Sequence, residues 1–178
     1  GSMIVVSSSF NMISDEIRNA YNPFESCASA QMLIKNERSD EMILSVSRRT
    51  DIPNYYSEWF YNRIKEGFLY VRNPMNAHQI SEIKITPDVV DCIVFWTKNP
   101  LPMMKRLNEI KDYNYYFQFT LTGYGNDVEV NLPNKKTEMI PVFQELSEKI
   151  GKQKVIWRYD PIFFSDRYTK EYHLKAFK

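Results

Sequence analysis

Residues 90–100 read VDCIVFWTKNP, and this stretch decides the fold class. Its apolar part, Asp91 to Trp96, consists mainly of β-branched and aromatic residues, which is typical of a strand buried inside a parallel sheet. A polar tip follows directly, and Pro100 suits the first turn of a helix over residues 101–110. A buried strand, a polar loop and a helix in this order form one β-α unit.

The same rhythm recurs from Met42 to the end of the chain. Further strands are predicted at residues 43–47, 115–121 and 154–158, and further helices at residues 57–66, 136–150 and 169–178. Repeated β-α units favour a parallel sheet with the helices outside it. We therefore expect an α/β fold: a partial (β/α) TIM-like barrel with a mainly parallel sheet. We expect it to be truncated, because the last helix has no stop signal before the chain ends.

One segment interrupts this rhythm. Residues 68–72 and 79–85 predict two strands of a hairpin around the turn at residues 73–76. Asn73 and His78 lie in or next to this turn.

The first part of the chain is different in character. Gly1-Ser2-Met3 resembles a tag-cleavage scar, residues 3–6 predict a strand, and residues 14–20 predict a helix. We expect residues 1–41 to be a tag scar with an N-terminal extension of uncertain role. Residues 42–178 are expected to be the N-terminal part of an α/β barrel domain.

The composition excludes several classes of protein. The chain carries 23 Lys and Arg against 22 Asp and Glu, a net charge of +1, so no overall field favours nucleic acid or an anionic membrane. No apolar run approaches the roughly 20 residues that span a bilayer. Cys27 and Cys92 are the only cysteines and form no cluster, so we expect a reduced, cytoplasmic protein with no metal in this chain. Cys92 is expected to be a buried structural thiol.

Polar side chains follow the predicted strands, at the point where each strand ends. Because ligands bind at the carboxyl ends of parallel strands in α/β folds, we expect a ligand-binding rim there. The predicted rim consists of Arg48, Arg49, Asp51, Asn73, His78, Thr97, Lys98, Asn99, Gln118, Thr120, Arg158 and Asp160. Arginine binds carboxylates and phosphates through paired hydrogen bonds, and Lys98 adds a point charge, so the expected ligand is an anionic small molecule.

Structural roles stay open for the same residues. Asp51, Asn99 and Asp160 suit helix or turn caps, and Arg158 suits an ion pair with Asp160. His78 has no cysteine or carboxylate partner at metal-ligand spacing and suits a turn or surface position. A hydrolase that uses Asp51, His78 and Asp160 as acid–base groups is a further alternative, although the sequence offers it no nucleophile.

Five stretches of the sequence resemble a bacterial family catalogued as domain of unknown function 1848. They are residues 42–53 (MILSVSRRTDIP), 71–74 (VRNP), 90–100, 117–122 (FQFTLT) and 155–161 (VIWRYDP). Members of that family are functionally uncharacterised and carry a cysteine cluster near the C-terminus, similar to the iron–sulfur-binding cluster of radical SAM enzymes. The resemblance implies a longer parent that uses an iron–sulfur cluster and S-adenosylmethionine, of which this chain is an N-terminal barrel fragment, inactive alone.

Two functional hypotheses follow. The first is this fragment of a radical-SAM-like enzyme, with no cofactor bound by the chain itself. The second is a stand-alone module that binds an anionic ligand through Arg48, Lys98 and Arg158. A partial barrel leaves open strand edges and uncovered apolar faces, so self-association is expected under either hypothesis.

Overall fold

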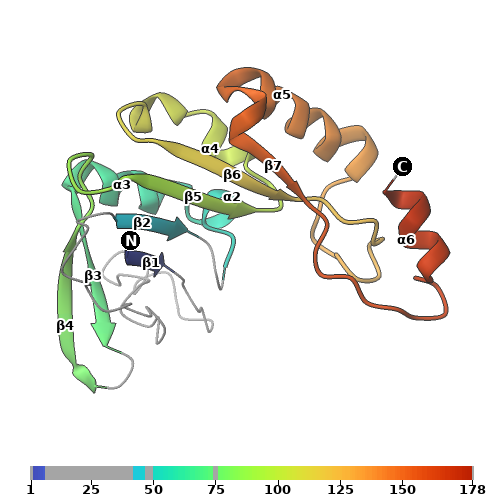
Figure 1. Ribbon diagram of the computed structural model, residues 1–178, viewed down its shortest axis with the longest axis horizontal. Helices are drawn as coiled ribbons and strands as arrows, with labels where there is room; N and C mark the ends of the chain where they lie inside the picture. The colour runs from blue at the N-terminus through green and yellow to red at the C-terminus, as the bar shows by residue number, and fades with distance from the viewer. Residues whose placement is uncertain (1, 7–41, 47–49, 74–75, 178) are drawn as a thin grey trace.

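The protein contains one open, parallel β-sheet (Figure 1). The computed structural model describes residues 2–6, 42–46, 50–73 and 76–177. The strands of the sheet are, in spatial order, β1 (Ser2–Val6), β2 (Met42–Val46), β5 (Cys92–Thr97), β6 (Tyr115–Thr120) and β7 (Val155–Arg158). All neighbouring strands run parallel. The predicted α/β fold with a parallel sheet is confirmed, but the described strands do not close into a barrel, since β1 and β7 each pair on one side only.

Two helices, α3 (Ser57–Glu66) and α5 (Ile140–Ile150), cover one face of the sheet. The shorter α2 (Ile52–Tyr55) and α4 (Leu101–Met104) follow β2 and β5, and α6 (Lys170–Ala176) lies away from the sheet, beside the loops after β6 and β7 (Figure 1). Phe60 of α3 contacts Phe95 of β5, with 5.3 Å between ring centroids. Phe143 of α5 contacts Phe119 of β6 at 5.4 Å. The strand register places Phe95 and Phe119 on the same face, and Figure 1 shows α3 and α5 above it.

The core between this face and the helices is rich in aromatic residues. Phe95 stacks on Phe117 with 4.8 Å between ring centroids, and neither side chain is exposed. Leu44 of β2 and Leu146 of α5 belong to the same buried cluster. Burial of each such side chain contributes about 1.5–3 kcal/mol. This packing fixes which side chains of each strand meet the helices and which lie on the opposite face.

A two-stranded hairpin leaves the sheet between α3 and β5, as predicted. It consists of β3 (Phe68–Asn73) and β4 (Asn76–Lys84), which run antiparallel. Gly67 ends α3 with φ of 80°, a left-handed conformation that glycine adopts without strain. Its carbonyl accepts a hydrogen bond from the N–H of Ile85 at 2.8 Å, where the hairpin returns. The hairpin projects from the amino-terminal side of the strands (Figure 1).

One predicted helix is wrong. Residues 101–110 form α4 and a separate 3₁₀ turn, Leu107–Ile110, instead of one continuous helix. Arg106 lies between the two with φ of −126° and ψ of 21°, outside the helical region. Its guanidinium forms ion pairs with Glu58 and Glu109, on either side of this break.

The region before Met42 contributes to the sheet. The strand predicted at residues 3–6 is confirmed as part of β1, which pairs with β2. Ser2 and Met3, which resemble a tag scar, belong to this strand. The helix predicted at residues 14–20 lies outside the described residues. No helix in the described ranges is both long and apolar enough to cross a bilayer.

Candidate functional site

Asp51 links the loop after β2 to the loop after β5. Its carboxylate accepts hydrogen bonds from Thr97 Oγ1 at 2.7 Å and from the Lys98 N–H at 2.7 Å. It also caps α2 by accepting from the Asn54 N–H at 3.1 Å. Burial raises the pKa of Asp51, although these hydrogen bonds act in the opposite direction. Both carboxylate oxygens are engaged within the protein, which indicates a structural role.

Asn99 extends the same network. Its side-chain amide donates to Asn54 Oδ1 at 3.2 Å, and its Oδ1 accepts from the Leu101 N–H at 3.1 Å. Its own N–H donates to Thr97 Oγ1 at 3.0 Å. The structure therefore brings three predicted rim residues together, Asp51, Thr97 and Asn99, in a network that joins the starts of α2 and α4.

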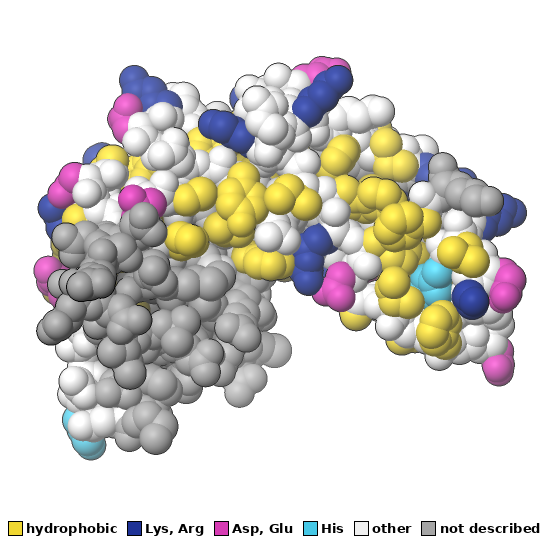
Figure 2. All heavy atoms as spheres, viewed as in Figure 1, with side chains coloured by type: hydrophobic (Ala, Val, Ile, Leu, Met, Phe, Trp, Pro, Cys, Tyr) yellow, Lys and Arg dark blue, Asp and Glu magenta, His cyan; other side chains and the backbone are white. Residues whose placement is uncertain are grey.

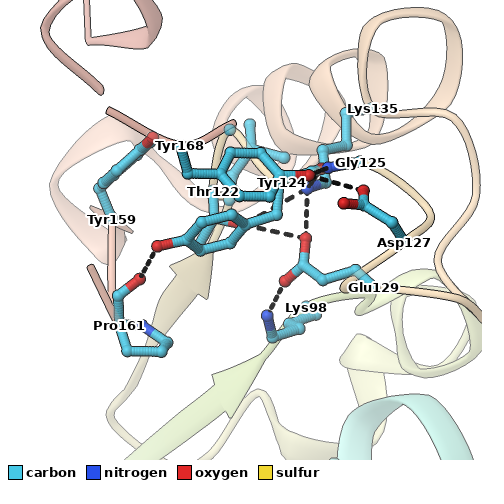
Figure 3. Close-up of polar contacts among 12 residues, drawn as sticks. Lys98, Thr122, Tyr124, Gly125, Asp127, Glu129, Lys135, Tyr159, Pro161 and Tyr168 are labelled. Carbon is cyan, nitrogen blue, oxygen red and sulfur yellow. Dashed lines mark hydrogen bonds and ion pairs between the residues drawn. The ribbon is translucent and has the colours of Figure 1, made fainter. Parts of the chain in front are cut away.

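Lys98 forms an ion pair with Glu129, a residue of the long loop after β6 (Figure 3). The Glu129 side chain is only 8% exposed. One of its oxygens accepts from Lys98, and the other accepts from Lys135 and from Thr122 Oγ1, the latter at 2.9 Å. Burial by itself would raise the pKa of Glu129, but the hydrogen bonds from Lys135, Lys98 and Thr122 outweigh it and lower the pKa. Lys98 is therefore neutralised by a buried carboxylate.

The loops after β6 and β7 pack on each other through aromatic side chains (Figure 3). Tyr124 stacks on Phe163 with 4.5 Å between ring centroids, and its hydroxyl donates to the Pro161 carbonyl at 3.0 Å. The Tyr168 hydroxyl donates to Asp127 Oδ1 at 2.6 Å. These contacts hold the loop that carries the buried carboxylate in place.

His173 joins α6 to the end of β7. Its Nε2 lies 3.0 Å from the Phe163 carbonyl, which only accepts, so Nε2 carries the proton. Its Nδ1 lies 2.8 Å from the Tyr159 hydroxyl. His173 is buried, with both ring nitrogens engaged.

The face of the sheet opposite α3 and α5 carries a second set of side chains, which we call the exposed sheet face. Its members on β5, β6 and β7 are Val94, Trp96, Tyr116, Gln118, Thr120, Ile156 and Arg158, of which Val94 and Thr120 are buried. In the strand register Gln118 lies between Trp96 and Ile156. Its amide has no hydrogen-bond partner among the described residues. A band of hydrophobic side chains crosses the middle of Figure 2, with charged side chains of both signs at its border.

Among the residues that the structure describes on β5, β6 and β7, Arg158 is the cation of this face. Its guanidinium carbon lies 4.5 Å from the centroid of the Trp96 ring, and the indole N–H donates to Ser45 Oγ at 3.0 Å. One guanidinium nitrogen, Nη2, donates to Asp160 Oδ2 at 2.5 Å. The Arg158 side chain is 34% exposed, and a guanidinium has five N–H groups. Donors are therefore left for a second anion.

The comparison with known proteins identifies the family. The family described as "Domain of unknown function (DUF1848)" matches residues 43–178. The chain belongs to this family. No curated protein and no solved structure matches it. The family prediction is confirmed. The description of DUF1848 names no reaction, so only the side chains described above indicate a function.

Two predicted rim residues of this DUF1848 chain, Asn73 and His78, are not brought to the carboxyl edge. Arg48 and Arg49 lie outside the described residues. Asn73 ends β3, and His78 is an exposed residue of β4, both in the hairpin on the amino-terminal side of the sheet. The N–H of His78 donates to Asn76 Oδ1 at 3.2 Å.

The residues of the DUF1848 chain do not fit an iron–sulfur cluster. Such a cluster needs several clustered thiolates, and the sequence has two cysteines that are 65 positions apart. Cys92 is half-buried in β5, where burial raises the pKa of its thiol, and Cys27 lies outside the described residues. Within the described ranges, no group of three or more His, Cys, Asp or Glu side chains is placed to hold a metal.

Several residues of this site escaped the sequence analysis. Glu129 lies in a loop without apolar periodicity, and Lys135 begins the π-helical turn Lys135–Met139; single charges at such positions look like solvated surface residues. Trp96 looks like a core residue of its strand. A usable signal exists for Trp96 alone, because it alternates with the buried Phe95 and Thr97 and therefore lies on the other face of β5.

Proposed function

We propose that the protein binds a small anionic molecule on the exposed sheet face, with Arg158 as the charged anchor. The observation that carries this proposal is the position of the guanidinium, over Trp96 and at the carboxyl end of β7. The carboxyl ends of parallel strands are where α/β folds bind ligands. A mostly apolar surface with few polar groups, such as the amide of Gln118, is typical of small-molecule sites.

Lys98 takes no direct part in the proposed site. Glu129 engages it, so Lys98 is not a free ligand-binding cation. The proposal therefore depends on the guanidinium of Arg158.

We further propose that the sheet belongs to an α/β barrel. The spatial order of the strands follows their order in the chain, from β1 to β7, whereas a doubly wound sheet reverses its order. Both α3 and α5 cover the same face, as the outer helices of a barrel do. In this arrangement the exposed sheet face corresponds to the barrel interior, with Arg158 at its mouth.

Calorimetric titration with acetate, citrate and inorganic phosphate tests the binding proposal. We expect Arg158→Ala to lower the affinity for the anion that binds best by at least about tenfold, since hydrogen bonds to charged groups contribute about 1.5–3 kcal/mol. Arg158→Lys should recover only part of this affinity, because lysine restores the positive charge but its ammonium cannot form the paired hydrogen bonds. Arg167→Ala is the matched control, since Arg167 also pairs with an aspartate and lies over an aromatic ring. Equal affinities of wild type and Arg158→Ala would refute the proposal.

A radical-SAM-like reaction of a longer parent is the second candidate, and the barrel-like strand order favours it. Neither Cys27 nor Cys92 fits a cluster, so its ligands would have to come from residues outside these 178. Anaerobic reconstitution of the full-length parent with iron and sulfide, followed by an absorbance spectrum, tests this candidate. A reconstituted parent that does not cleave S-adenosylmethionine would contradict it.

A further inference from the structure

An apolar stretch continues from Arg158 along the exposed sheet face. Ile156 precedes Arg158 by two positions in β7, and its side chain is 46% exposed. Tyr116 precedes Gln118 by two positions in β6 and is partly exposed. Because alternate residues of a strand share a face, these side chains lie on the same side of the sheet as the guanidinium.

We infer that the ligand is an amphiphilic anion, whose acid group binds Arg158 and whose apolar body covers Ile156 and Tyr116. This inference rests on the proposed function of the same site. Charge complementarity gives the orientation of the ligand. Arg158 places a cation at the carboxyl end of the stretch, and the next side chains along it are apolar or uncharged.

The dimensions of the stretch set the size of the ligand. Arg158 pairs with Thr120 in the strand register, and Tyr116 lies four positions earlier in β6. At about 3.3 Å per residue the stretch is roughly 13 Å long. A carboxylate with a medium-length alkyl or aryl body therefore fits it better than a compact anion.

The exposed Ile156 distinguishes this ligand from a hydrophilic one. A body that covers Ile156 removes apolar surface from water, so the affinity should grow with the apolar area of the ligand. A free phosphate or acetate ion leaves Ile156 in water and gains nothing from it. The dependence of affinity on chain length therefore reports directly on the inferred contact.

The test is a calorimetric titration with butyrate, hexanoate and octanoate at concentrations below micelle formation. We expect the affinity of the wild type to rise about two- to fourfold per methylene, the upper value for full burial and the lower for half. Octylamine has the same apolar body but a cationic head, so it should not bind.

Two variants of Ile156 isolate the apolar contact. Ile156→Thr should flatten the chain-length series by weakening octanoate far more than butyrate, and a far-UV circular dichroism spectrum equal to that of the wild type shows that the variant is still folded. Ile156→Val, which removes one methylene, should reduce the slope slightly. Ile162→Thr is the matched control, because Ile162 is 52% exposed but lies in the loop after β7, and its slope should equal that of the wild type.

The outcomes separate the inference from the proposed function. If all three carboxylates bind with equal affinity and depend on Arg158, the anion site stands and the amphiphilic ligand is wrong. If none binds in an Arg158-dependent way, the proposed function fails as well. A slope that survives in Ile156→Thr but disappears in Ile162→Thr would place the apolar contact elsewhere and overturn the inference.

Discussion

Replacement of Glu129 by glutamine should destabilise the protein by about 1.5–4 kcal/mol. The carboxylate is 8% exposed and joins Lys98, Lys135 and Thr122. Lys135 is 19% exposed, so its charged hydrogen bond should contribute about 1.5–3 kcal/mol. Lys98 is 37% exposed, so solvent screening limits its contribution to about 0–1 kcal/mol. Glutamine keeps one oxygen for Thr122 and leaves both ammonium groups without their counter-charge.

The assay is urea denaturation at pH 7, followed by far-UV circular dichroism. Glu109→Gln is the matched control, because it removes the same charge from an exposed ion pair with Arg106 and should change stability much less. A loss of less than about 0.5 kcal/mol in Glu129→Gln would refute the reasoning, since the loop after β6 would then not depend on the buried carboxylate.

Acidification gives an independent check on Glu129. Its pKa is lowered on folding, so between the folded pKa and its ordinary value of 4.5 the unfolded chain binds more protons than the folded protein. The stability that the carboxylate contributes is therefore complete above pH 4.5 and is lost as the pH falls through the folded pKa. Wild type should lose stability in this window, and the difference between wild type and Glu129→Gln should shrink there.

Four further predictions concern residues that hold the fold together. Asp51→Ala should cost about 2–4 kcal/mol in urea denaturation, because it removes the cap of α2 and leaves buried donors unpaired. The raised pKa of Asp51 has the opposite pH effect from that of Glu129, so its ionisation should lower stability as the pH rises above its ordinary value of 3.8, a slope that should be absent in Asp51→Asn. Gly67→Ala should cost about 1–2 kcal/mol in thermal unfolding, because φ is 80° and the added Cβ would lie 2.9 Å from a Thr86 methyl. His173→Ala should remove the hydrogen-exchange protection of α6, because the Tyr159 hydroxyl and the Phe163 carbonyl lose their hydrogen bonds to the His173 ring.

The sequence predicts the β-α units because their signals are local. The strand that ends at Thr97 is a continuous apolar run, and α3 ends at a glycine, so each boundary depends on residues close to it in the chain. The break at Arg106 was not predictable in this way, because its partner Glu58 lies 48 positions away. Whether the sheet is open or closed depends on which strands pair with each other. The spacing of apolar residues along the sequence does not report that pairing.

The candidate site was predicted in part. Asp51, Lys98 and Asn99 follow predicted strands in the sequence, and the structure brings them near one edge of the sheet. The sequence does not say which of these side chains already have hydrogen-bond or ion-pair partners within the protein. That depends on partners such as Glu129, which is 31 positions from Lys98. The predicted self-association through open strand edges stays a prediction.

Arg158 differs from the other predicted rim residues Asp51, Thr97 and Asn99 in what its side chain contacts. Thr97 faces the helices, whereas Arg158 lies on the opposite face, because the two residues have different parity in the strand register. Asp51, Thr97 and Asn99 form hydrogen bonds within the loops after β2 and β5. Removing one of these side chains should therefore lower stability more than it lowers anion affinity. The Arg158 side chain is 34% exposed and lies outside the buried core. Removing its guanidinium should therefore lower anion affinity and leave the free energy of unfolding almost unchanged. A comparison of Asp51→Ala with Arg158→Ala in both assays therefore separates the residues that build the edge from the residue that is available to a ligand.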